Sequence, residues 1–196
     1  SLLPYMILEF LTEILGRLFI SFPSARRRIL FSNLHHALPH RNHGEIKRIA
    51  RESAARMFEM GFFSLCYPFF AKDTLRRSMT YSSEAEKKIK SLQAGSEPVI
   101  VMVPHVCLFE TIATSPYFRP QGRRELGAIY RPNKNKALDR WINLARLKVG
   151  IRTFSREDGL SQTKTFLKQG NWLAILYDQN AGTQGTLSLF LDRVAS

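Results

Sequence analysis

The sequence predicts an α/β fold with a mixed, largely parallel sheet covered by helices. From residue 98 onward, short apolar runs alternate with amphipathic segments, two of which end at Gly150 and Gly170. Strands that alternate with helices favour a parallel sheet, because the connection between two parallel strands needs a crossover. Before residue 98 the pattern is mainly helical, so we expect further helices N-terminal to the sheet.

Composition narrows the class of protein. With 44% apolar and 23% charged residues, the 196-residue chain is neither disordered nor a polytopic membrane protein. The net charge of +13 favours anionic partners, namely nucleic acid, lipid headgroups or an acidic carrier protein. The two cysteines, Cys66 and Cys107, form neither a metal spacing nor a disulfide framework, which predicts a reduced, cytosol-facing protein.

The first 22 residues are strongly apolar and predict one helix. Its charges Glu9, Glu13 and Arg17 are four residues apart and therefore share one narrow stripe. The pattern leaves two interpretations open: a membrane-associated helix, lying at the interface or left from a truncated anchor, and a core helix of a soluble domain. Arg26–Arg28 suit an anionic membrane surface, although such runs are commonly solvated. We expect a membrane-associated helix over residues 1–25 and one domain over 26–196.

The remaining elements follow from periodicity. Residues 45–67 predict an amphipathic helix that runs into the aromatic block Phe62–Phe70, and residues 72–90 are polar and partly helical. The later segments are, in order, a strand at Val99–Val103, a helix around Phe109–Ser115, a strand at Leu126–Tyr130, a helix at Lys136–Lys148, a strand at Ile151–Phe154, a helix at Leu160–Lys168, a strand at Trp172–Tyr177 and a further strand at Thr186–Phe190. Because this last strand is followed by almost nothing, we expect the domain to be incomplete at its C-terminus.

A candidate catalytic histidine follows the first strand of this region. Val99–Val103 leads directly into Pro104-His105, and ligands of parallel sheets gather beyond the carboxyl ends of the strands. Glu110 is expected on the next helical turn, where its carboxylate would bind one ring nitrogen and leave the other free to take a proton. A structural role for both residues is the alternative, because a His and a Glu at this spacing also arise by chance.

The rest of the sequence argues against covalent and metal chemistry. No serine lies in a nucleophile elbow, and Cys107 is poorly placed beside His105, which favours direct transfer onto a bound hydroxyl. The four other histidines, His35, His36, His40 and His43, surround Pro39 in a loop-like stretch without a metal-ligand spacing. We therefore expect no metal and no cofactor.

Five motifs in order resemble the bacterial lipid A biosynthesis (lauroyl/myristoyl) acyltransferase family, within the lysophospholipid acyltransferase-like superfamily. They are Asn33-Leu34 with Leu38-Pro39, the segment Pro104–Glu110 with its H-x4-D/E pattern, Tyr130-Arg131-Pro132-Asn133 with Trp141 and Arg146 after it, Ser155–Gly159, and Leu176-Tyr177-Asp178-Gln179 with Gly182 and Gly185. The resemblance extends from about Arg26 to the last residue.

This resemblance implies an O-acyltransferase in which His105 is the general base and Glu110 its orienting partner. It implies catalytic support or substrate binding by Arg131, Asn133, Arg146 and Asp178. Without the resemblance, Arg131 would be interpreted as a cation at a strand end and Arg146 as one partner of an ion pair on its own helix. Asp178 would be interpreted as the cap of a turn. Arginines suit phosphate recognition, and lipid A precursors are phosphorylated sugars.

The implied donor is an acyl carrier protein thioester, and the implied acceptor is an anionic lipid A precursor or a related membrane glycolipid. The implied location is the cytoplasmic face of the bacterial inner membrane. The competing hypothesis is a basic module without enzymatic activity that binds nucleic acid or membrane. No helix-turn-helix, zinc finger or RNP-like run is visible, so nucleic acid is not an expected partner.

Overall fold

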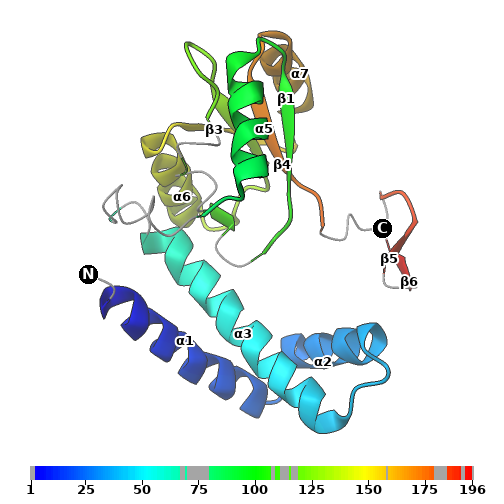
Figure 1. Cartoon of the computed structure of the whole chain (residues 1–196). Helices are drawn as coiled ribbons and strands as arrows, with labels where there is room; N and C mark the ends of the chain where they lie inside the picture. Colours follow the sequence, from blue (N-terminus) through cyan, green and yellow to red (C-terminus); the bar gives the residue numbers. More distant parts are fainter. Residues whose placement is uncertain are drawn as a thin grey trace. The chain divides into compact units, whose positions relative to one another are not determined.

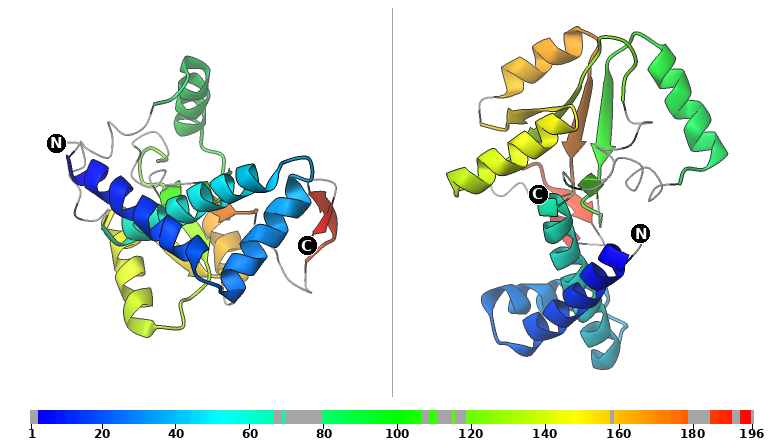
Figure 2. Two further views of the ribbon diagram at one scale, coloured as in Figure 1. Left: turned by 90° about the horizontal axis from the view of Figure 1, so that it is seen from below. Right: turned by 90° about the vertical axis from the view of Figure 1, so that its left-hand side faces the viewer.

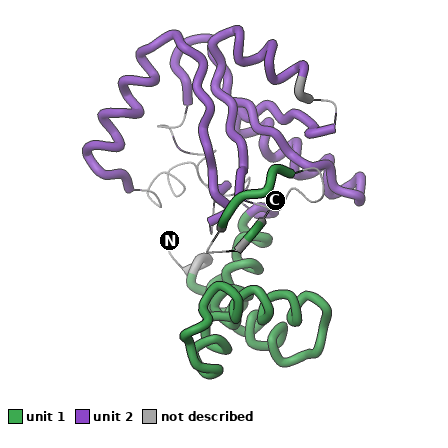
Figure 3. Tube along the Cα trace, turned by 90° about the vertical axis from the view of Figure 1, so that its right-hand side faces the viewer, with its two compact units in different colours: residues 1–63, 180–196 green, residues 64–179 purple. Residues whose placement is uncertain are grey.

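The computed structural model in Figure 1 describes residues 3–66, 69, 80–106, 109–110, 115, 119–157, 159–178, 185–190 and 193–195. The chain forms two compact units (Figure 3): residues 1–63 with 180–196, and residues 64–179. The predicted boundary at residue 25 falls inside the first unit and stays a prediction.

The first unit is built mainly from three helices, α1 (Leu3–Ser21), α2 (Ala25–Ala37) and most of α3 (His43–Cys66), seen from two sides in Figure 2. Its core consists of buried Ile20, Ala50 and Ala54, against which Phe19, Leu30, Phe31 and Leu34 pack. The same unit contains the antiparallel pair β5 (Ser188–Phe190) and β6 (Arg193–Ala195).

Helix α2 was not predicted. The sequence indicates a charged run and a loop that carries the histidines at these residues, but His35 and His36 lie in the last turn of α2. None of its side chains is buried, so its sequence has little apolar periodicity to detect. A local signal was present, because the Ser24 side chain caps the helix by accepting a hydrogen bond from the Arg27 backbone N–H at 3.1 Å.

The second unit confirms the predicted α/β class. Strands β1 (Val99–Val103), β2 (Leu126–Tyr130), β3 (Ile151–Ser155) and β4 (Trp172–Leu176) form one sheet in the order β1-β4-β2-β3. All neighbours in this sheet are parallel. Among the described residues, the helices that accompany the sheet are α5 (Ser83–Ala94), α6 (Lys136–Lys148) and α7 (Gly159–Lys168).

Helices cover both faces of the sheet, because side chains alternate along each strand. Trp172 on one face of β4 belongs to a cluster against which Leu92 of α5 packs. The next residue, Leu173, faces the other way and packs with Phe154 and with Phe166 of α7. Figures 1 and 2 accordingly show α5 and α7 on opposite sides of the sheet.

Helix α6 has clear start and stop signals. Asn135 caps its first turn by accepting hydrogen bonds from the backbone N–H groups of Ala137 and Leu138. Gly150 follows the last turn at a φ of 79°, a left-handed conformation that a residue without a Cβ adopts freely. Gly150 is the signal from which the end of this helix is predicted, and α6 has the predicted bounds.

Most of the helix expected around Phe109–Ser115 lies outside the described residues. Within the described part of the chain, no helix combines the length and the apolar character that a membrane crossing requires.

Candidate active site

The candidate active site lies at the carboxyl edge of the parallel sheet, where β1 and β4 end side by side. Val103 of β1 pairs in register with Leu176 of β4. His105 and Asp178 each follow two residues after this pair, so adjacent parallel strands deliver them to equivalent positions. The strand order alone thus brings together two residues that are 73 positions apart in the sequence.

Asp178 holds His105 by two hydrogen bonds. Nδ1 of the His105 ring lies 2.5 Å from Oδ1 of Asp178, and the His105 backbone N–H donates to Oδ2 at 2.8 Å. Both side chains are partly exposed, and the edge of the imidazole contacts the Phe109 ring with centroids 5.3 Å apart.

The electrostatics of this pair determine which ring nitrogen is free. Partial desolvation raises the pKa of the Asp178 carboxyl, but the hydrogen bonds from the His105 ring and backbone lower it further, and the net pKa lies below its usual value. Asp178 is therefore an ionised acceptor at neutral pH, and Nδ1 must carry the proton. Nε2 is left as the basic nitrogen, and it has no hydrogen-bond partner among the described residues.

Glu110, the expected partner of His105, makes a different contact. Its carboxylate lies 2.5 Å from Nη2 of Arg146, and both side chains of this ion pair are largely buried. Arg146 also lies over the Tyr130 ring at 6.0 Å. The structure therefore brings all four predicted residues His105, Asp178, Glu110 and Arg146 into specific pairs, but with Asp178 rather than Glu110 on the imidazole. The reason is that β4, which carries Asp178, is the direct neighbour of β1.

The block Tyr130–Asn133 leaves the end of β2 and is held by α6. Oδ1 of Asp139 accepts a hydrogen bond from the Asn133 backbone N–H at 2.7 Å, and the Tyr130 hydroxyl lies 3.5 Å from Oδ2. The Asn133 side chain accepts from the backbone N–H of the capping residue Asn135. Arg131 is exposed at this strand end.

Sequence reasoning missed the role of Asp139 in this region. In the structure, Arg146 pairs with Glu110, and Asp139 anchors the turn. Asn143, one helical turn later, donates to the Asp139 carboxylate and so fixes it further. The available signal was the position of an acidic residue in the first turn of a capped helix.

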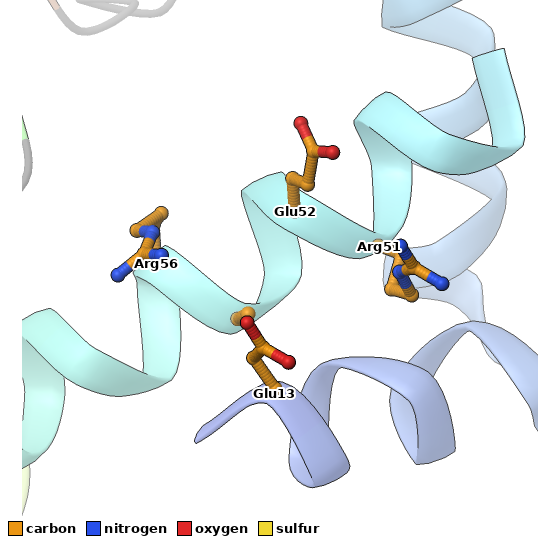
Figure 4. Close-up of a pocket in the computed structure, with 5 residues that line it drawn as sticks. Glu13, Arg51, Glu52 and Arg56 are labelled. Atoms are coloured by element: carbon orange, nitrogen blue, oxygen red, sulfur yellow. The ribbon is translucent and has the colours of Figure 1, made fainter. Parts of the chain in front are cut away.

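A small pocket lies elsewhere, between α1 and α3 in the first unit. It has a volume of about 90 Å³ and is lined by Glu13, Arg51, Glu52, Ala55 and Arg56, four of which are labelled in Figure 4. Arg56 pairs with Glu59 and with Glu9, so charges of the two helices compensate one another. We interpret this pocket as part of the ion-pair network between the helices and assign no ligand to it.

The histidines around Pro39 do not form a described metal centre. The His35 and His43 rings stack with centroids 6.4 Å apart, and Nδ1 of His36 bonds the Ser32 carbonyl. Among the residues that the structure describes, no group of three or more potential ligand side chains could hold a metal ion.

A parallel sheet with a hydrogen-bonded histidine and carboxylate at its carboxyl edge is typical of α/β enzymes that use histidine as a general base. The model of the family described as bacterial lipid A biosynthesis acyltransferase matches residues 1–195. The chain therefore belongs to this family and is an acyltransferase of the lipid A biosynthesis type. No curated protein matches the chain.

Proposed function

We propose that this protein transfers a fatty acyl group from an acyl carrier protein thioester to a hydroxyl of a lipid A precursor or a related membrane glycolipid. The observation that carries the proposal is the His105–Asp178 pair at the strand ends, with Nε2 as the free basic nitrogen. The family supports an acyl donor and a lipid acceptor.

The proposed reaction is a direct transfer with histidine as base and then acid. Nε2 of His105 takes the proton of the acceptor hydroxyl while the oxygen attacks the thioester carbonyl, and the carbonyl electron pair moves onto its oxygen. When this pair returns, the carbon–sulfur bond breaks and the thiolate receives the proton from Nε2. The products are an ester and the carrier thiol, and Asp178 keeps the ring in the required tautomer throughout.

The other site residues have supporting roles in this proposal. Glu110 supports catalysis by holding Arg146 in an ion pair rather than by contacting the imidazole. Arg146 is thereby neutralised, so the exposed Arg131 is the better candidate for contacting an anionic acceptor. Asn133 shapes the turn that presents Arg131, since both its backbone and its side chain are hydrogen bonded to the start of α6.

We also propose that the protein works at the cytoplasmic face of the bacterial inner membrane, with α1 lying on the membrane surface. Seven large apolar side chains of α1 and its C-terminal flank are exposed: Met6, Ile7, Phe10, Leu11, Ile14, Leu18 and Phe22. A helix with such a face and a following arginine run is suited to an anionic interface.

Replacement of His105 by Ala tests the mechanism. We expect the turnover number to fall by about 10²–10⁴, the usual contribution of a general base, while circular dichroism shows an unchanged fold. His40→Ala is the matched control, because His40 is exposed and lies outside the site. Near-normal turnover in a folded His105→Ala protein would exclude His105 as the base.

A further inference from the structure

Helix α6 directs three of its polar side chains toward the protein. Asp139, Asn143 and Arg146 lie on its inner side, where they bind the Tyr130–Asn133 turn and Glu110. Ala145 on the same side is buried. An ordinary surface helix turns mainly polar residues to the solvent, whereas the outer face of α6 combines cations with exposed apolar side chains.

The outer face carries large apolar side chains. Trp141 is 42% exposed, Leu144 52% and Leu147 64%, at the spacing of three residues that places them on one side of a helix. The ring of Phe69, which is 71% exposed, stacks on Trp141 with centroids 5.7 Å apart. These four residues form the α6 patch, an apolar surface of the kind that marks an interaction site.

The surroundings of the α6 patch indicate its partner. Arg140 and Lys148 lie on the same helix face and are exposed, and this face of α6 carries no acidic residue, since Asp139 points inward. Cations beside the patch match anionic headgroups, and a tryptophan among leucines suits the boundary between headgroups and acyl chains. An acidic protein would complement Arg140 and Lys148 but would not need four exposed apolar side chains in one patch.

We propose that the outer face of α6 inserts into the surface of an anionic lipid bilayer, as a membrane contact of the second unit. The α6 patch enters the upper acyl region, while Arg140 and Lys148 bind lipid phosphates. The inner face of the same helix holds the Tyr130–Asn133 turn, so this contact places the candidate site beside the lipid surface. The proposal does not depend on the chemistry of His105.

The two tryptophans of the chain allow a direct test. Trp172 is 1% exposed, so a change in emission on adding lipid reports on Trp141. The full chain is mixed with vesicles of phosphatidylcholine alone or with phosphatidylglycerol. We expect a shift of emission to shorter wavelength with the anionic vesicles, and quenching by lipids brominated on the upper acyl chain.

The variant L144K/L147K keeps the reporter but adds two charges to the patch. It should lose the shift and the quenching, because each buried leucine contributes roughly tenfold or more to partitioning. Ile100→Thr, which changes an exposed apolar residue of β1 outside the patch, should keep both signals. The His105→Ala protein should also keep them, which separates this test from the test of the mechanism.

Three results would overturn the proposal. If the chain binds vesicles but Trp141 emission does not change, α1 or another segment makes the contact alone. If an acidic acyl carrier protein shifts the emission and vesicles do not, the patch is a protein docking surface. If the shift depends on protein concentration without lipid, the patch joins two copies of the chain.

Discussion

At the scale of single residues, the site contains two carboxylates in different surroundings. Asp178 is partly exposed, and its partner is a titratable imidazole. Glu110 is buried, and its partner is an arginine that cannot lose its proton. A carboxylate therefore fixes the tautomer of the histidine base at Asp178, whereas at Glu110 it neutralises the charge of an arginine.

This difference predicts opposite phenotypes for two conservative substitutions. Asp178→Asn should lower the turnover number by about 10²–10⁴ with little loss of stability, because an amide no longer selects the Nδ1–H tautomer. Glu110→Gln should lower the free energy of unfolding by about 3–5 kcal/mol, because it leaves the buried Arg146 unpaired. Steady-state kinetics and urea unfolding of both variants measure the two effects. If Glu110→Gln were stable but inactive, Glu110 would act on the imidazole directly, as first expected from the sequence.

At the scale of helices, α1 and α3 meet at a position that only glycine fits. A Cβ added to Gly16 would lie 2.8 Å from the Ala55 backbone nitrogen and 2.9 Å from the Arg51 carbonyl oxygen. Since both neighbours are backbone atoms of α3, neither can move without displacing the helix.

Gly16→Ala should therefore destabilise the first unit by about 1–3 kcal/mol, as overpacking usually does. Gly61→Ala is the matched control in α3, because a Cβ there meets nothing within 4 Å. It should stabilise the helix by about 0.5–1 kcal/mol through higher helix propensity. Thermal unfolding of both variants tests the pair, and equal effects would contradict the close crossing of α1 and α3.

The start of α3 is a reciprocal cap with a pH dependence. The Asn42 side chain accepts from the Glu45 N–H at 2.9 Å, and Glu45 accepts from the Asn42 N–H at 3.1 Å. Hydrogen bonds from Arg41 and then from the Asn42 backbone lower the pKa of Glu45 below its ordinary value of 4.5.

A lowered carboxyl pKa means that the stabilisation is complete above pH 4.5 and is lost as the pH falls through the lower folded-state pKa. Hydrogen exchange in the first turn of α3 should therefore accelerate in acid relative to Glu45→Gln. That variant keeps an acceptor for the Asn42 N–H but cannot titrate. Parallel pH profiles for the two proteins would show that the Glu45 charge does not stabilise the cap.

At the scale of the whole molecule, the net charge of +13 has a consequence for the proposed acyl carrier protein donor. A basic protein attracts an acidic acyl carrier protein over a distance that shrinks with salt, since the Debye length falls from about 10 Å at 0.1 M to about 3 Å at 1 M. Values of kcat/KM with the carrier donor should therefore fall steeply with salt and exceed those with coenzyme A at low salt.

The measurement is a salt titration with both donors at the same acyl chain length. The soluble carrier and coenzyme A must be compared with the acceptor in neutral detergent, so that salt does not also change membrane binding. Equal kcat/KM values with the two donors and no dependence on salt would contradict docking of the carrier protein. The basic surface would then serve membrane binding alone.

The sequence by itself determined the four strands of the sheet, the end of α6 and the position of His105 after β1. These features depend on residues that are close in the chain, so apolar periodicity, Gly150 and a short motif were sufficient to predict them. Helix α2 was not predicted, because none of its side chains is buried and its sequence therefore shows little apolar periodicity.

Only the tertiary structure decided how the site residues are paired. The order β1-β4-β2-β3 places Asp178 beside His105, while the inner face of α6 brings Arg146 to Glu110. Strand order and helix orientation arise from packing between segments far apart in the sequence. A local sequence pattern cannot show whether the fold brings Glu110 or Asp178 to the imidazole, because either carboxylate could bind a ring nitrogen.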